Sequence, residues 1–127
     1  MSLRSDLGRV RGLGSAKDGT GHWWAQRLTA IALIPLTIWF VISLVIMTGS
    51  GHDAAIAWIG SPLTAVLLVL LIVAGFHHMQ LGLQVVIEDY VHTRWLEIAL
   101  LHCVKGAAIL FGAIAVFAVL KIAFGGA

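Results

Sequence analysis

The chain has 127 residues, of which 60% are hydrophobic and only 11% are charged. An ordinary soluble domain carries roughly 25% charged residues, so this composition excludes a water-soluble globular protein. The net charge is +2 and the mean hydropathy is +0.99. The length also excludes a large enzyme with its own substrate domain, because three membrane spans of about 20 residues each fill about half of the chain.

Three apolar runs follow one another along the chain, and each is about long enough to cross the hydrocarbon core of a bilayer. A polar tail and an interfacial segment precede them at 1–27, with no apolar run long enough for a signal peptide. The predicted spans are 28–47, 62–87 and 96–124. We therefore expect an all-α fold, with three transmembrane helices in a single membrane domain.

Turn chemistry separates the predicted spans. The stretch 48–53 reads Thr-Gly-Ser-Gly-His-Asp and is expected in solvent, and Pro62 suits the first turn of the second helix. The polar segment 88–94 ends the second helix. Trp95 then lies where an interfacial aromatic residue would anchor the start of the third helix.

Basic residues are concentrated on one side of the predicted membrane domain. That side carries Arg4, Arg9, Arg11, Lys17, Arg27 and Arg94, whereas the other side carries only Lys121. By the positive-inside rule, the N-terminal tail and the loop between the second and third helices are cytoplasmic. The sequence has no transit peptide, which favours a bacterial inner membrane. This charge pattern indicates membrane orientation, and no nucleic-acid partner is expected.

The second span holds the candidate functional residues, because ionisable groups within a span are costly and usually serve a function. At about 100° per residue, Gly75, His78, Gly82 and Asp89 fall within a narrow stripe, and His77 points about 100° away from it. Two glycines beside a histidine leave a flat recess that a planar macrocycle can occupy. Alternatively, the glycines only allow close helix packing, and His78 bonds a neighbouring Ser or Thr. The residues alone leave these two interpretations evenly balanced.

The approach to the first span contains a second group of candidates. Trp23 and Trp24 suit the aromatic belt of a membrane interface. Arg27 either snorkels to lipid headgroups or pairs with a carboxylate just inside the membrane, such as a haem propionate. If the chain is helical here, His22 approaches the same region. Taken without other information, snorkelling is the simpler interpretation of Arg27.

The segment from His78 to Val91 resembles the H-x3-G-x6-D-Y-V signature of the small hydrophobic anchor, the D subunit, of succinate dehydrogenase (respiratory complex II). The segment Arg27-Leu-Thr-Ala-Ile is similar to the N-terminal arginine element of that family. The resemblance implies a complex that oxidises succinate on a flavoprotein subunit and passes electrons through an iron–sulfur subunit. Quinone is then reduced at a site shared with two membrane anchors. This chain would not be catalytic on its own.

The resemblance also implies roles for individual residues. His78 matches the axial ligand to haem b, with the second axial histidine supplied by the partner anchor, the C subunit. Tyr90 matches the tyrosine that hydrogen-bonds a carbonyl of ubiquinone or another quinone, and Asp89 accompanies it at that site. Arg27 resembles the arginine near the haem propionates, and His22 is a further candidate for the same neighbourhood.

Three other functions remain open at this point. The same architecture serves a quinol:fumarate reductase, in which electrons flow the other way. A purely structural anchor without a cofactor would keep His78 as a satisfied buried histidine. A self-contained haem protein using His78 and His102 is disfavoured, because the two lie at different depths, about 15 Å and about 9 Å from the cytoplasmic boundary.

The third span carries residues for which we predict structural roles. Lys105 can snorkel, and His102 can pack or bond within the bundle. Ala108 and Gly112 form a small-xxx-small pair that fits close helix contact. The single Cys103 allows neither an intrachain disulfide nor a cysteine-based metal site, and it is expected to be a buried thiol.

Overall fold

The computed structural model describes residues 5–10 and 19–125. Within these ranges the chain forms helices and no strand, which confirms the all-α prediction. The helices are α1 (Asp6–Val10), α2 (Gly19–Ile46), α3 (His52–Gly60), α4 (Pro62–Tyr90) and α5 (Arg94–Ala123). The basic residues Arg4, Arg11 and Lys17 of the predicted tail lie outside the described residues.

Three of these helices, α2, α4 and α5, are long and apolar enough to cross a membrane. Their most apolar stretches have mean hydropathies of 2.4, 2.0 and 2.3, yet only 0%, 11% and 6% of those stretches is buried inside the chain. Apolar surface on this scale is stable only against lipid or another apolar protein surface. The chain is therefore a multi-pass membrane protein with three transmembrane helices.

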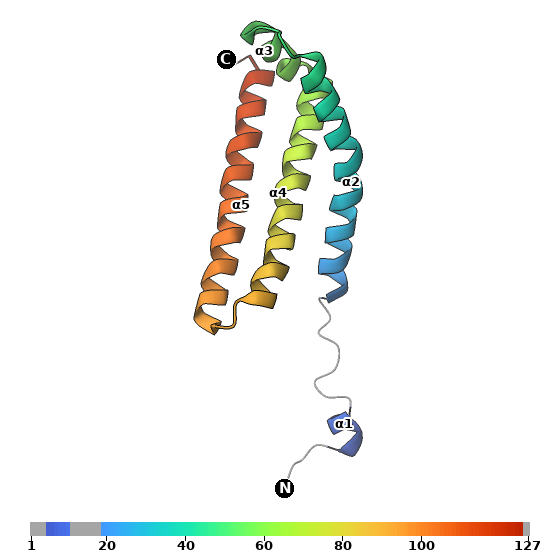
Figure 1. The fold of residues 1–127 in the computed structure, drawn as a ribbon, viewed down its shortest axis with the longest axis vertical. Coiled ribbons are helices and arrows are strands. Elements are labelled where there is room, and N and C mark those ends of the chain that lie inside the picture. The colour runs from blue at the N-terminus through green and yellow to red at the C-terminus, as the bar shows by residue number, and fades with distance from the viewer. Residues whose placement is uncertain (1–4, 11–18, 126–127) are drawn as a thin grey trace.

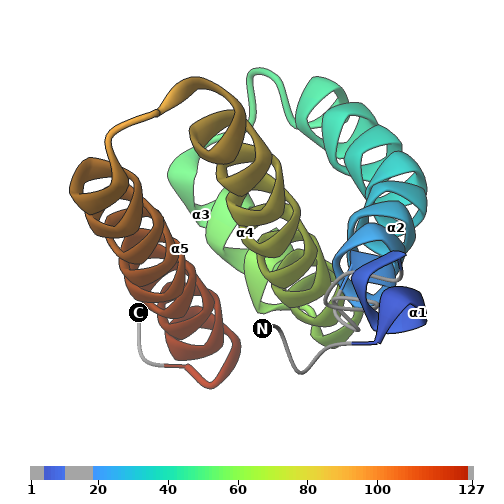
Figure 2. The ribbon, with the colours of Figure 1, turned by 90° about the horizontal axis from the view of Figure 1, so that it is seen from below.

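The three long helices lie side by side in one layer, with α4 in the middle, between α2 and α5 (Figures 1 and 2). Helix α4 packs against both neighbours, whereas α2 and α5 share no contact among the described residues. The buried apolar residues accordingly lie mostly on α4 and comprise Ala65, Leu68, Leu81, Ile87 and, from α5, Ala108. The three spans form an open layer with two broad faces, and no closed bundle encloses a central cavity.

The connection between α2 and α4 contains a helix that the sequence analysis did not predict. It follows a turn in which Gly49 adopts a φ of 86°, a conformation that glycine tolerates best. Trp58 of α3 stacks on Trp39 of α2, with ring centroids 5.9 Å apart and an interplanar angle of 27°, and Phe40 lies 6.4 Å from Trp58. This aromatic cluster fixes α3 against the end of α2. Pro62 begins α4 at its first turn, as predicted.

The third predicted span agrees with the structure in its packing, with one exception. Ala108 is buried, and a Cβ added to Gly112 would lie 3.6 Å from the Phe76 ring, so the small residues do allow α5 to approach α4. Cys103, however, is exposed and not buried. It is exposed because, among the described residues, α5 packs against α4 and α3 and the rest of its surface is uncovered.

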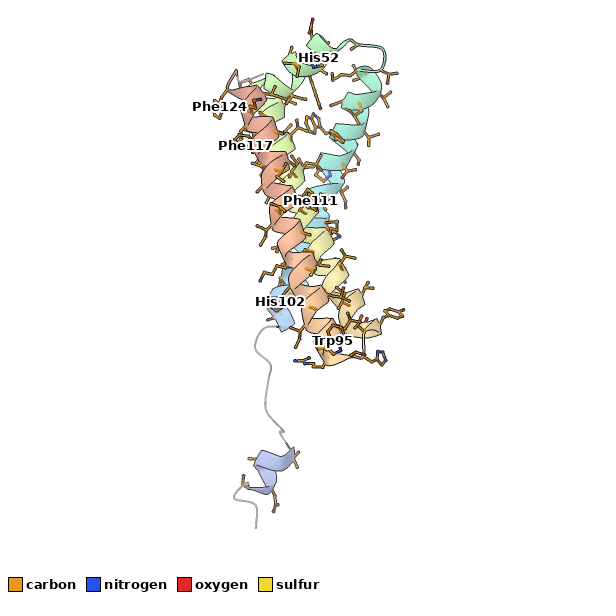
Figure 3. All side chains as sticks on the ribbon, turned by 90° about the vertical axis from the view of Figure 1, so that its left-hand side faces the viewer. His52, Trp95, His102, Phe111, Phe117 and Phe124 are labelled. Carbon is orange, nitrogen blue, oxygen red and sulfur yellow. The ribbon has the colours of Figure 1, made fainter. Side chains whose placement is uncertain are left out.

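One end of the layer collects most of the polar candidates. The antiparallel arrangement places the start of α2, the end of α4 and the start of α5 together (Figure 1). Figure 3 shows Trp95 at this end, with His102 next along α5, and His52 at the opposite end. His52 and Asp53 are exposed there and lie 3.5 Å apart, as expected for residues outside the membrane.

Candidate functional site

The two glycines of the predicted stripe lie where α4 faces α2. A Cβ added to Gly75 would lie 3.9 Å from Leu33 Cδ2, and one added to Gly82 would lie 3.7 Å from Gln26 Nε2. Both neighbours belong to α2. The glycines therefore let the two helices approach closely, as small residues commonly do in membrane proteins.

Between these glycines, His78 forms a hydrogen bond across the helix pair. Its Nδ1 lies 2.9 Å from Thr29 Oγ1, and the ring is half-buried. The Thr29 hydroxyl also lies 2.7 Å from the carbonyl oxygen of Ala25 and 3.1 Å from that of Gln26. This geometry has the features of the close-packing interpretation, in which His78 bonds a neighbouring Thr. It occupies Nδ1 and leaves the other ring nitrogen, Nε2, for a further partner.

The adjacent histidine, His77, lies on a different face of α4. It is exposed and lines a groove of about 320 Å³ between α4 and α5, together with Gln80, Lys105 and Ala108. The two histidines thus face different helices, and only His78 shares a face with Gly75 and Gly82. His102 and His78 have different partners: His102 Nδ1 donates to Ile98 O of its own helix at 2.8 Å, whereas His78 bonds Thr29 of α2.

Two buried polar atoms on α2 lack hydrogen-bond partners among the described residues. They are His22 Nε2 and Gln26 Oε1. His22, Gln26 and Thr29 follow the i, i+4, i+7 spacing that brings residues to one face of a helix. A buried polar group without a partner costs about 1–3 kcal/mol, so we expect a polar group from outside the described residues to complete these contacts.

The position of His22 along the helix axis, relative to α4, follows from the antiparallel register of α2 and α4. The pairs Leu33 with Gly75, Thr29 with His78, and Gln26 with Gly82 advance along the two helices in opposite directions. His22 lies seven residues before Thr29, or about 10 Å along α2. Its level therefore falls between His78 and the C-terminal end of α4.

Arg27 does not lie with His22 in this structure. It is exposed, and its guanidinium carbon lies 5.1 Å from the centre of the Trp23 ring. At about 100° per residue, Arg27 is about 160° around α2 from Thr29, so it faces away from α4. Within this chain, His22 and His78 lie where α2 and α4 face each other, whereas Arg27 lies on the outer surface of α2.

Asp89 and Tyr90 form the last turn of α4. Both side chains are exposed, Tyr90 to 79%, and no other described residue hydrogen-bonds the phenol oxygen. The helix is continuous from His78 to Tyr90, so the two residues are separated by about 18 Å along the axis. One turn earlier, Gln84 Nε2 donates to Glu88 Oε1 at 2.9 Å.

The described residues contain no group of three or more His, Cys, Asp or Glu side chains that could hold a metal ion. A chelate built by this part of the chain alone is thereby excluded. A macrocycle supplies most of the ligands to its own metal ion, so such a site needs only one side chain from this chain.

Thr29 and Gln26 were not predicted from the sequence as part of the site. Both lie on α2, and the sequence does not determine the register of α2 against α4. Their proximity to His78 and Gly82 therefore could not be predicted directly. Their spacing from His22 was the one available indication, because it places all three on one helix face.

Comparison with known proteins identifies the family. The family described as "Succinate dehydrogenase/Fumarate reductase transmembrane subunit" matches residues 1–122. The chain belongs to this family. The succinate dehydrogenase hydrophobic membrane anchor subunit of Rickettsia bellii is 32% identical over 108 residues, which cover 85% of this chain and 86% of the relative. The subunit of the same name from Paracoccus denitrificans is 36% identical over 81 residues, covering 64% and 63%.

A relative of lower sequence identity is also named a membrane anchor subunit. The succinate dehydrogenase membrane anchor subunit of Reclinomonas americana is 28% identical over 96 residues, which cover 73% of this chain and 80% of the relative. No solved structure matches the chain significantly. As a member of the succinate dehydrogenase/fumarate reductase transmembrane family, the chain is an anchor subunit, and its three apolar helices form the anchor.

We predict that Gly82→Leu separates α2 from α4, because the new side chain must displace the Gln26 amide that lies 3.7 Å from the Cβ position. Overpacking of this kind costs about 1–3 kcal/mol. Spin labels on the exposed residues Ile31 and Val85 would report the interhelical distance, which should increase. Gly106→Leu on α5 is the matched control, since a Cβ at Gly106 meets nothing within 4 Å. An unchanged distance in Gly82→Leu would contradict the glycine contact.

Proposed function

We propose that this chain is a membrane-anchor subunit of a succinate:quinone oxidoreductase that supplies one axial histidine to haem b and part of a quinone-reduction site. In this function the chain does not itself oxidise succinate. It holds the redox groups within the membrane and connects them to the soluble subunits. The names of the relatives, all succinate dehydrogenase subunits, favour electron flow from succinate to quinone over the reverse direction.

The observation that carries this proposal is the position of His78. It is an ionisable residue in the middle of a span, it is half-buried, and one ring nitrogen is held by Thr29 at 2.9 Å. Its second ring nitrogen lies across the ring and points away from Thr29. Such residues within a membrane are costly and usually serve a function. Neutral imidazole is a competent axial ligand to haem iron.

The surroundings of His78 fit a haem. His22 Nε2 and Gln26 Oε1 are buried and have no hydrogen-bond partner among residues 5–10 and 19–125, and they lie on the same face of α2 as Thr29. The His22 ring could donate a hydrogen bond to a propionate carboxylate, and a 180° rotation of the Gln26 amide would present a second donor. Arg27 is the further contact expected from the resemblance, and it must leave the Trp23 ring to reach a carboxylate on this side.

A haem bound here would supply one-electron redox chemistry within the membrane. Two residues of this chain would hold it: His78 as a ligand to the iron, and His22, at the start of α2, as a contact to a carboxylate. Because the layer is open, another chain would supply the second ligand, and we propose that this chain is the partner anchor, the C subunit. Shared ligation would also tie the two anchors together.

The quinone site is proposed at the end of α4. The Tyr90 hydroxyl is exposed at the helix terminus and donates a hydrogen bond to a quinone carbonyl, which stabilises the negative charge that develops as the ring is reduced. Asp89 lies beside it and is also exposed. With the N-terminal side cytoplasmic, electrons from an iron–sulfur subunit reach this quinone without crossing the bilayer, after a flavoprotein subunit has oxidised succinate.

One specific observation favours a second function, that of a purely structural anchor. The Thr29–His78 bond and the packing of α2 against Gly75 and Gly82 are the contacts that such an anchor would need. A structural anchor, however, gives no reason for the buried atoms of His22 and Gln26 that lack a partner in the described part of the chain. Haem content of the assembled complex distinguishes the two functions.

We predict that His78→Ala abolishes or strongly reduces the haem spectrum of the purified complex, because it removes the axial nitrogen. His77→Ala is the matched control: it removes the adjacent imidazole, which lies on the α5 side, and should largely spare haem. Optical spectra of the reduced complexes measure this directly. The reverse pattern would assign the ligand to His77, and normal haem in both variants would favour the structural anchor.

We predict that Tyr90→Phe lowers succinate:quinone activity severalfold or more, because it keeps the ring and removes only the hydrogen-bond donor. Succinate oxidation by an artificial acceptor, haem content and assembly should stay at their wild-type values. If Tyr90 only meets headgroups and water at the interface, quinone reduction by the variant will equal that of the wild type. That result in an intact complex would remove Tyr90 from the quinone site.

A further inference from the structure

The Thr29 hydroxyl has one proton and three neighbouring atoms that can accept it. These are the carbonyl oxygens of Ala25 and Gln26, at 2.7 Å and 3.1 Å, and Nδ1 of His78 at 2.9 Å. The distance to Ala25 is typical of an O–H···O hydrogen bond. If the proton pointed at His78 instead, the Thr29 and Ala25 oxygens would lie 2.7 Å apart with no hydrogen between them, which is repulsive. The proton therefore belongs to the Ala25 bond.

With its proton directed at Ala25, Thr29 Oγ1 can only accept from the imidazole. A distance of 2.9 Å suits an N–H···O bond from His78 Nδ1. The neutral ring carries one proton, and this bond places it on Nδ1. Nε2 is then left with its lone pair. The other tautomer, with the proton on Nε2, has no lone pair to offer a metal there.

We propose that Thr29 is a positioning residue that selects the tautomer and fixes the ring orientation of His78, so that its Nε2 is ready to bind haem iron. This inference rests on the proposed function of His78 as an axial ligand. Metal-binding histidines generally donate their other ring N–H to an oxygen acceptor, which raises the basicity of the ligand. Here the acceptor is the Thr29 hydroxyl oxygen, whose own proton is donated to the Ala25 carbonyl oxygen.

The position of Thr29 depends on the packing already described. Gly75 and Gly82, on either side of His78, let α2 approach closely enough for the bond to form. Thr29 is half-buried at this contact, whereas Thr37, on the same helix, is exposed. Thr37 is therefore a matched control for replacing a threonine of α2 without touching the histidine.

The test compares Thr29→Ser and Thr29→Ala in the complete complex, purified in mild detergent. Both variants lose the γ-methyl group, so they differ only in the hydroxyl. Optical redox titration gives the midpoint potential of the haem, and the haem-to-protein ratio gives its retention. Thr29→Ser should keep the wild-type potential. Thr29→Ala should raise the potential, because a less basic imidazole stabilises oxidised iron less, and should weaken haem binding about 10-fold to 100-fold.

A control variant and the comparison of the two Thr29 variants decide whether the inference holds. Thr37→Val should leave the potential and haem content unchanged. Complete haem loss in Thr29→Ala with retention in Thr29→Ser would also support the inference, since the hydroxyl alone separates the two. Equal potentials and equal haem content in Ser and Ala would overturn it. His78→Ala distinguishes failure of the proposed function from failure of the Thr29 inference. If His78→Ala keeps the haem, the proposed function fails. If it loses the haem while Thr29→Ser and Thr29→Ala have equal potentials and haem content, only the role of Thr29 fails.

Discussion

The contact between α2 and α4 is the interaction on which the rest of the molecule depends. Lipid is as apolar as the helix surfaces, so no hydrophobic force drives these helices together, and close packing and hydrogen bonds must do so. Gly75 and Gly82 provide the close packing, and the bond between Thr29 and His78 provides the polar link. The same contact sets the register that determines which residues of α2 lie beside the central histidine.

The open layer explains why this chain functions as an anchor within a larger assembly. Helix α4 contacts both neighbouring spans, but α2 and α5 do not meet among the described residues, so both faces of the layer remain uncovered. Such a layer can present one side of a haem or quinone site but cannot enclose it. The polar atoms of His22 and Gln26 that have no partner within the described residues lie on α2 beside α4, where the proposed haem would complete their contacts.

The sequence predicted the features that follow from local rules. Long apolar runs indicated the three spans, and helical periodicity alone was enough to place His77 and His78 on different faces of one helix. The α3 helix was missed, because a nine-residue segment after a Gly-Ser-Gly turn has no strong helical signal. The partners of Thr29 and the outward position of Arg27 depend on how α2 packs against α4, which periodicity within one helix cannot determine.

A high-resolution cryo-EM map of the intact complex tests the central claim most directly. We expect haem density with iron bonded to His78 Nε2, Thr29 Oγ1 within hydrogen-bond distance of Nδ1, and the second axial ligand from another chain. A complex without haem at this face, or an iron bound by two histidines of another subunit with His78 turned away, would contradict the account.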